Sequence, residues 1–516
     1  MASTIGSIGL EQQPSLFSAF KMVYFVFFGS LGVIQPTLPV YFEAVNHFTK
    51  YQIGVLQMIP NAIAFLVAPF MTALADRYES SQTYLFVCSL IIATILTMTM
   101  LLCQSFLLNV LLIFLISVAR ASLIPMLDAR TIGSLSDSRR YGEIRLYGAL
   151  SFGLLVLLTG WLIDKSNDEE ISEQDEAEKD VYINGFKYVF YLHLALSLIG
   201  GIVVIFYPVF PSGSSELSGK STKNIELTDF QDTGQNYERV NLSSPMYECD
   251  EVKHSNGDAS NVNNESVHNK GVFEVMRELI RNHPDVISFI IIVFLSGLGD
   301  GVIDAFLFLR LKELGGSGKV MGIGRFVTCM AEIPMFQLSG YLQEKFGTYP
   351  LLAVTQLAFV VRFIFYATLT DPWYVIPCEA LNGITFAVTW SVSCTYASSI
   401  APEGATATIQ SILDSLHWGL GSGSGALIGG IIYELVGSVN LFLLSALLSA
   451  ISMFIACVAA ITTDTTNDTK SFNSTEQMRK LAKGREDKGE KFQSSVGSIS
   501  PMFTEISLSD SDTEIS

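Results

Sequence analysis

Twelve long stretches of the sequence are almost entirely apolar, and this limits the possible folds more than any other feature. A helix that crosses a bilayer needs about 20 mainly apolar residues, because the hydrocarbon core is about 30 Å thick and offers no water to backbone polar groups. With 49% hydrophobic and 16% charged residues, the composition is also that of a membrane protein. The sequence therefore predicts an all-α polytopic membrane protein with twelve transmembrane helices, at residues 17–42, 51–75, 83–103, 107–129, 142–163, 185–209, 286–310, 320–342, 349–369, 373–399, 405–433 and 439–462.

A polar stretch in the middle of the chain separates six helices from six. Residues 210–270 are rich in Ser, Asn, Asp and Glu, which is typical of a disordered linker. Residues 271–283 then place apolar side chains on one helical face, the pattern of a short helix at a membrane interface. The expected parts are a cytosolic N-terminus (1–16), an N-terminal six-helix bundle (17–209), a cytosolic linker ending in the interfacial helix (210–283), a C-terminal six-helix bundle (284–463) and a disordered cytosolic tail (464–516).

The placement of basic residues predicts the orientation. Lysine and arginine in short loops stay cytoplasmic, and they follow the even-numbered helices, whereas residues 164–180 after the fifth helix hold nine acids against two lysines. Both termini are therefore expected in the cytosol, in the plasma membrane or an endomembrane. The formal net charge of −18 leaves no basic face for nucleic acid, and no metal-site, P-loop or disulfide pattern is present, so no cofactor is expected.

The two halves carry matching motifs. TALADRY (72–78) ends the second helix and GYLQEKFG (340–347) ends the eighth, and each holds an acid-base pair that is typical of a gating motif: Asp76 with Arg77, and Glu344 with Lys345. GALSFG (148–153) and GLGSGSGALIGG (419–430) are faces of small residues, which allow close helix contact. Matching features six helices apart indicate an internal repeat.

These motifs resemble the major facilitator superfamily. YGEIRLYGALSFG (141–153) and residues 381–437 are similar to its lactose-permease-like and nucleoside-proton-symporter-like branch, with orphan members of the major-facilitator-associated-domain type, and the resemblance covers residues 17–462. It implies a monomeric secondary transporter, not an enzyme, that moves a small polar solute by alternating access, with proton symport. The chain departs from the superfamily motif at Thr72, where Gly is usual, and at residues 79–82, where basic residues are usual.

Ionisable residues inside the C-terminal segments are the candidates for proton coupling. A charge at mid-bilayer costs about 2.5–3.5 kcal/mol, so each must be paired, hydrated or protonated. We expect Asp304 to pair with Arg325, and Asp300, Glu332 or Asp414 to take up and release the proton. His417 is expected to be the only deep histidine. The complete set is Asp300, Asp304, Arg325, Glu332, Asp414 and His417.

Two alternatives remain for these charges. They can serve only to lock helices together. GLGD at 297–300 also matches the Gly-X-Gly-Asp pattern of intramembrane aspartyl proteases, but no Tyr-Asp dipeptide occurs in the chain, which argues against that chemistry.

The N-terminal half offers fewer charges, at Arg120, Asp128 and Arg145. The resemblance implies that an acid on the fourth helix and an arginine on the fifth bind solute hydroxyls, and Asp128 and Arg145 match best; the alternative is an inner-gate salt bridge between them. Further candidates for a solute cavity are the polar or aromatic residues Gln35, Gln57, Asn61 and Trp390. At the level of the whole protein, the alternatives are a non-transporting receptor or nutrient sensor and an uncoupled facilitator.

Overall fold

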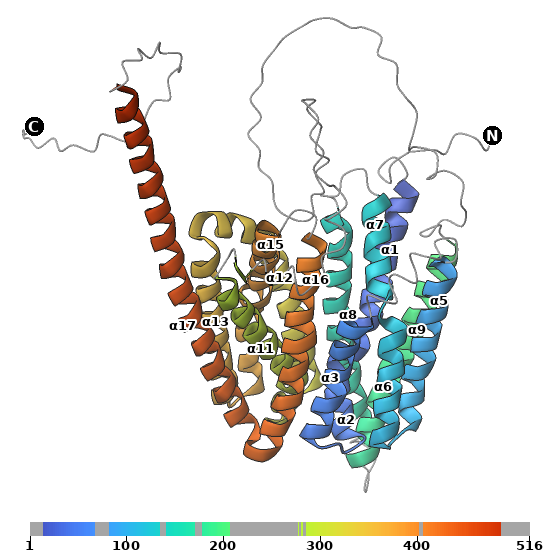
Figure 1. The fold of residues 1–516 in the computed structure, drawn as a ribbon. Coiled ribbons are helices and arrows are strands. Elements are labelled where there is room, and N and C mark those ends of the chain that lie inside the picture. The colour runs from blue at the N-terminus through green and yellow to red at the C-terminus, as the bar shows by residue number, and fades with distance from the viewer. Residues whose placement is uncertain are drawn as a thin grey trace, which may run out of the picture. The chain divides into compact units, whose positions relative to one another are not determined.

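The computed structural model describes residues 14–67, 82–134, 141–170, 178–206, 277, 280–281, 285–401 and 406–486. Every regular element in these ranges is a helix (Figure 1). The predicted all-α class is therefore confirmed.

The first half consists of helices that coincide with the predicted apolar segments as far as these are described. Thr49 caps the start of α3 with a capping box: its side chain accepts a hydrogen bond from the backbone N–H of Gln52, and the Gln52 side chain accepts one from the backbone N–H of Thr49. These bonds satisfy N–H groups that a helix start leaves free. The elements are α1 (Pro14–Ile34), η2 (Gln35–Thr37), α2 (Leu38–Ala44), α3 (Lys50–Leu66), α5 (Gln82–Thr99), η4 (Met100–Leu102), α6 (Phe106–Arg120), α7 (Leu123–Ser134), α8 (Tyr141–Glu170) and α9 (Glu178–Phe206).

The second half is also helical, and two of its segments contain π-helical turns. η8 and η9 have π geometry, which is rare and occurs frequently at functional sites. The elements are α11 (Val286–Glu313), α12 (Gly318–Phe346), α13 (Thr348–Thr368), η7 (Pro372–Tyr374), α14 (Val375–Glu379), η8 (Gly383–Val388), α15 (Thr389–Ile400), α16 (Thr406–Asp414), η9 (Ser415–Ser422) and α17 (Gly423–Glu486).

Nine stretches of the described chain are long and apolar enough to span a membrane, which supports a multi-pass membrane protein. One of them, Thr408–Thr463, holds two predicted segments, and the chain turns between them at Gly437, whose φ of 83° suits glycine because it has no Cβ. Two predicted segments are not among the nine. The segment at 51–75 runs beyond the described residues, and α12 is less apolar because it carries Arg325 and Glu332.

The end of the chain differs from the sequence-based expectation. Residues 464–486, assigned to a disordered tail, are helical as part of α17. Contacts group the chain into one unit up to Ala460 and a second from Ile461. Of the predicted interfacial helix at 271–283, only Arg277, Ile280 and Arg281 are described, and they are helical.

Glycines bring α11 against η9 and α17, as the small-residue faces predict. A Cβ placed on Gly297 would lie 2.2 Å from the carbonyl oxygen of His417, and one on Gly301 would lie 2.1 Å from that of Ser422. Between the two halves, a Cβ on Gly160 of α8 would lie 2.1 Å from the carbonyl oxygen of Gly318 on α12. Only glycine allows backbones to approach so closely.

One end of the molecule carries polar contacts between the halves. The buried carboxylate of Asp164, in α8, accepts hydrogen bonds from the backbone N–H groups of Gly318 (2.6 Å) and Lys319 (2.9 Å), at the start of α12. A second contact between the halves is made by Glu43 of α2, which forms ion pairs with Lys50 of α3 and with Lys312 of α11, the latter at 3.0 Å. We call these six residues, Asp164, Gly318, Lys319, Glu43, Lys50 and Lys312, the interhalf latch.

Replacing Gly301 with alanine tests the close approach. The new methyl group meets the Ser422 carbonyl, and overpacking of this kind typically costs about 1–3 kcal/mol of unfolding free energy. Gly201→Ala in α9 is the matched control, because nothing lies within 4 Å of a Cβ there. Thermal unfolding of the purified protein should show a lower Tm for Gly301→Ala alone; equal Tm values would contradict the packing.

Replacing Asp164 with alanine tests the latch. The backbone N–H groups of Gly318 and Lys319 lose their acceptor, which costs about 1–3 kcal/mol for a buried group. Hydrogen exchange of these two amides should accelerate about tenfold or more, whereas Asp164→Asn, which keeps an oxygen acceptor, should change it less. Unaltered exchange in Asp164→Ala would show that the carboxylate does not hold α12.

Candidate functional site

Asp300 and Asp304, the two acids of SGLGDGVIDAF (296–306), lie in the middle of α11 and have different surroundings. Asp300 is buried, and its Oδ2 lies 3.3 Å from Nε2 of His417, which belongs to η9. Asp304 has a side chain 46% exposed although Ile303 and Ala305 are buried. The i, i+4 spacing places both on one helix face, so that face borders space that is open at Asp304.

The predicted pairing of Asp304 with Arg325 is present. Nη1 of Arg325, in α12, donates to Oδ1 of Asp304 over 3.1 Å. The Arg325 side chain is 25% exposed, and its guanidinium lies 5.8 Å from the ring of Phe152 in α8. This ion pair therefore lies where the two halves meet.

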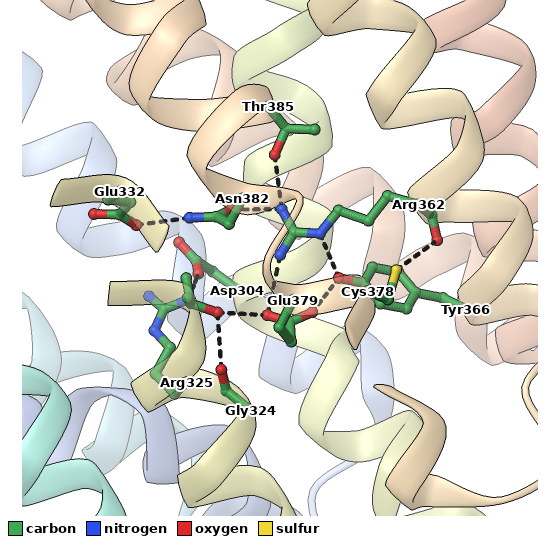
Figure 2. Close-up of polar contacts among 11 residues, drawn as sticks. Asp304, Gly324, Arg325, Glu332, Arg362, Tyr366, Cys378, Glu379, Asn382 and Thr385 are labelled. Atoms are coloured by element: carbon green, nitrogen blue, oxygen red, sulfur yellow. Dashed lines mark hydrogen bonds and ion pairs between the residues drawn. The ribbon is translucent and has the colours of Figure 1, made fainter. Parts of the chain in front are cut away.

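A second arginine, Arg362 of α13, is completely buried and lies at the centre of a polar cluster (Figure 2). It donates from Nη2 to Oε2 of Glu379 (3.1 Å), and from Nη1 to Oδ1 of Asn382 (2.5 Å) and Oγ1 of Thr385 (2.9 Å). Its Nε contacts the hydroxyl of Tyr366 over 2.5 Å. Four of the five N–H donors of a guanidinium are thus matched without water.

Local chain geometry explains how these partners converge. Arg362 and Tyr366 are four residues apart on α13, so they share a face. On the next segment, Glu379 is the last residue of α14, and Asn382 and Thr385 follow at intervals of three around the break before η8. The Tyr366 hydroxyl also donates to Glu379. We call Arg362, Tyr366, Glu379, Asn382 and Thr385 the Arg362 cluster.

Glu332 joins this cluster from α12. Nδ2 of Asn382 donates to Oε1 of Glu332 over 2.6 Å, and Oγ1 of Thr328, one turn earlier, donates to Oε2 of Glu379 over 2.7 Å. Among the described residues, no lysine, arginine or histidine forms an ion pair with Glu332. The connected cluster therefore contains two carboxylates and one guanidinium.

Arg362, Tyr366 and Glu379 were not predicted as site residues. A signal was available, because Arg362 and Glu379 are ionisable residues within apolar segments, where charges are expensive and usually functional.

Asp414 and Trp390 lie near His417. Asp414 is exposed and has no hydrogen bond among the described residues. The ring of His417 lies 5.1 Å from that of Trp390 and 4.9 Å from that of Trp418, between centroids. This aromatic group and the Asp300 carboxylate surround a histidine that is almost completely buried.

In the N-terminal half, Asp128 and Arg145 form a salt bridge, and both were predicted either to bind the solute or to pair with each other at an inner gate. Nη1 of Arg145, in α8, lies 3.0 and 3.1 Å from the two carboxylate oxygens of Asp128, in α7. The hydroxyl of Tyr24 donates to the same carboxylate over 2.6 Å, and the Arg145 guanidinium lies 4.5 Å from the ring of Phe28. Whether this pair contacts a solute or closes a gate stays a prediction.

Arg120 contacts a histidine that the sequence analysis missed. His193 of α9 is 1% exposed, so the expectation that His417 is the only deep histidine is wrong. Its Nε2 lies 3.3 Å from Nη2 of Arg120, and its Nδ1 lies 3.0 Å from the carbonyl oxygen of Ser30. Since Nδ1 donates to that carbonyl, Nε2 is free to accept from the arginine, and the ring is neutral.

The other predicted polar residues are dispersed. Asn61 of α3 donates to Ser422 of η9 over 3.3 Å and so connects the two halves. Gln35 is exposed and Gln57 half-buried.

Only one of the two predicted gating pairs lies within the described residues. Asp76 and Arg77 lie outside the described residues. Glu344 and Lys345 are exposed at the end of α12, where Lys345 lies against the rings of Tyr341 and Phe346.

Metal ligands do not cluster in the described chain. No group of three or more His, Cys, Asp or Glu residues is placed to hold a metal ion there.

Comparisons with known proteins agree over most of the chain. The model of the MFS_1 like family matches residues 17–444. Maltose permease of Geobacillus stearothermophilus is 22% identical over 430 residues, which are 82% of this chain and 90% of the permease.

Two solved structures share the fold. The nucleoside transporter NupG matches with a TM-score of 0.64 and 13% identity, over 86% of this chain and 99% of NupG. A bacterial homolog of the human lysosomal transporter Spinster matches with a TM-score of 0.62 and 14% identity, over 87% of this chain and 97% of that chain.

Neutralising Arg362 tests its role in holding the C-terminal half together. Arg362→Gln leaves Glu379 buried without its cation, and breaking a buried pair typically costs about 3–5 kcal/mol. Arg325→Gln is the control, because a partly exposed ion pair contributes about 0–1 kcal/mol. Thermal unfolding should show a much larger loss of Tm for Arg362→Gln; equal losses would contradict the structural importance of the cluster.

Proposed function

The chain belongs to the MFS_1 like family, and the permease and the nucleoside transporter to which it is similar are membrane transporters rather than enzymes. We therefore propose that it carries a small polar solute together with a proton. The observation that supports proton coupling is the charge imbalance of the Arg362 cluster with Glu332. Two carboxylates and one guanidinium share one connected set of hydrogen bonds within the membrane segments, so one bound proton balances the charge.

Glu332 is the carboxylate that best fits the bound proton. Glu379 has Arg362 as its cation and accepts two further hydrogen bonds, from Tyr366 and Thr328, whereas Glu332 is held by the neutral amide of Asn382. Glu332 is also only partly buried, so a proton can reach it. An intramembrane carboxylate without a cation must be hydrated or protonated. Proton coupling requires a carboxylate that can change between these two states.

The solute is proposed to bind between the two halves. Asp304 and Arg325 from one half and Asp128 and Arg145 from the other are all partly exposed, and a guanidinium offers several donors to a hydroxylated solute. Trp390 adds an aromatic face for a ring. Maltose permease and the nucleoside transporter NupG are named for hydroxylated substrates, which supports a sugar, a nucleoside or a similar molecule.

The transport cycle would alternate the accessible side. The interhalf latch joins the halves at one end, and opening it while the opposite end closes would move the site across the membrane. Orientation with both termini in the cytosol, a monomeric state and the plasma membrane or an endomembrane as location are parts of this proposal. A potential of 100 mV supplies about 2.3 kcal/mol for each charge moved, enough for roughly fifty-fold accumulation, so the mechanism needs no ATP.

Replacing Glu332 with glutamine tests the coupling. Glutamine keeps the hydrogen bond to Asn382 but binds no proton, so accumulation driven by an inward proton gradient should fall to the level without a gradient. Exchange of labelled for unlabelled solute needs no net proton movement and should continue. Both are measured in proteoliposomes with a solute first identified by thermal shift from a panel of sugars and nucleosides.

Asp371→Asn is the matched control. Asp371 is exposed and caps η7, and asparagine caps equally well, so its uptake should remain proton-driven. Coupling retained in Glu332→Gln would remove Glu332 from the mechanism. Equal wild-type uptake with and without a gradient would indicate an uncoupled facilitator, and binding without uptake a receptor or sensor.

A further inference from the structure

Among the described residues, Arg120 has no anionic partner. Its Nη2 contacts only the hydroxyl of Thr97 and the neutral ring of His193, each at 3.3 Å. No carboxylate among the described residues forms an ion pair with it. In the same half, the charge of Arg145 is compensated by Asp128, so the positive charge of Arg120 remains unbalanced.

The remaining donors of Arg120 are available. A guanidinium has five N–H donors, and the two contacts of Nη2 leave those of Nε and Nη1. Neither nitrogen belongs to the enclosed polar atoms that lack a partner, although neither has a hydrogen bond within the described chain. Arg120 is half-buried, so these nitrogens keep some accessible surface from which they can donate to a solute.

The position of Arg120 is also unusual. It is the last residue of α6, and the membrane segment Phe106–Ile132 is interrupted after it, before α7 begins at Leu123. The carbonyl groups at the end of α6 offset part of the positive charge. The tenth segment, which is fourth in its own half, is interrupted after Glu379. Interrupted helices at corresponding positions of two repeats point to a binding site in transporters.

We propose that Arg120, supported by neutral His193, binds an anionic oxygen group of the transported solute, either a carboxylate or a phosphate. This rests on the proposed transport function and narrows the solute to a polar molecule with a negative group. Arginine suits both groups because its planar donors match two oxygens at once.

The opposite half would not accept this group. Its membrane segments hold more acids than arginines, so an anion is repelled there, whereas Arg120 in the N-terminal half has no carboxylate partner among the described residues. The charges within the C-terminal segments are Asp300, Asp304, Glu332, Glu379 and Asp414 against Arg310, Arg325 and Arg362. A solute that spans the two halves would therefore place its anionic end at Arg120.

Binding to matched neutral and anionic compounds tests the proposal. The purified full-length protein is titrated with glucose, glucuronate and glucose phosphate, with uridine and uridine monophosphate, and with lactate and inorganic phosphate, while thermal unfolding is followed. At least one anionic compound should raise the Tm where its neutral parent does not. Its Kd should increase about tenfold or more in Arg120→Gln, and Arg120→Lys should recover part of the affinity.

Arg310→Gln is the matched control. Arg310 is a half-buried arginine at the end of α11 that contacts Ser438, Glu313 and the carbonyl of Leu369, and its loss should leave anion binding unchanged. The wild-type comparison of neutral and anionic compounds stands even if an Arg120 variant fails to fold.

The outcomes separate this site from the transport function. Stabilisation by no anionic compound beyond its neutral parent, or equal anion affinity in wild type and Arg120→Gln, overturns the site. Proton-driven uptake of a neutral solute that persists in Arg120→Gln leaves the transport function intact and rejects the site. Anion binding that depends on Arg120 without any uptake retains the site and rejects transport.

Discussion

The buried pair of Arg362 and Glu379 is the interaction on which the rest of the C-terminal half depends. A guanidinium in a region without water is tolerated only if its donors are matched and its charge is balanced, and here side chains of α13 and the tenth segment meet that requirement. Thr328 and Glu332 of α12 join them through hydrogen bonds with Glu379 and Asn382. This fixes α12, α13 and the tenth segment relative to one another. It also leaves Glu332 as the carboxylate without a cation, which connects the packing of the half to the proposed proton site.

The two halves treat charge differently although they repeat the same architecture. The C-terminal half gathers acids around two arginines, and the N-terminal half leaves Arg120 unmatched beside His193. Close backbone contacts at glycines, such as Gly160 against Gly318, bring these halves together with little intervening side-chain volume. A proton would then bind in the C-terminal half and an anionic group in the N-terminal half. Their joint binding would neutralise the excess negative charge of the one half and the positive charge of Arg120 in the other before the halves move.

The fold could be predicted because a membrane imposes a simple rule on sequence. Twelve apolar segments and the glycine-rich faces gave the helices and their close contacts. The Asp304–Arg325 pair was predicted, and the Asp128–Arg145 salt bridge was one of two alternatives for those residues. Arg120 and His193 lie on non-consecutive segments, so their contact depends on which helix faces meet and could not be predicted from the order of the segments. Arg362 and Glu379 lie on consecutive segments, and their pairing was not predicted. The helical extension to Glu486 carried no apolar signal, and residues 76 and 77 of the gating motif lie outside the described chain.

Alternating access requires that the face of α11 with Asp304 is reached by water first from one side of the membrane and then from the other. Labelling of Asp304→Cys, in a protein without its native cysteines, by a membrane-impermeant thiol reagent tests this in right-side-out and inside-out vesicles. The account predicts reaction from both sides. Reaction from neither side, in the presence or absence of solute and a proton gradient, would contradict it.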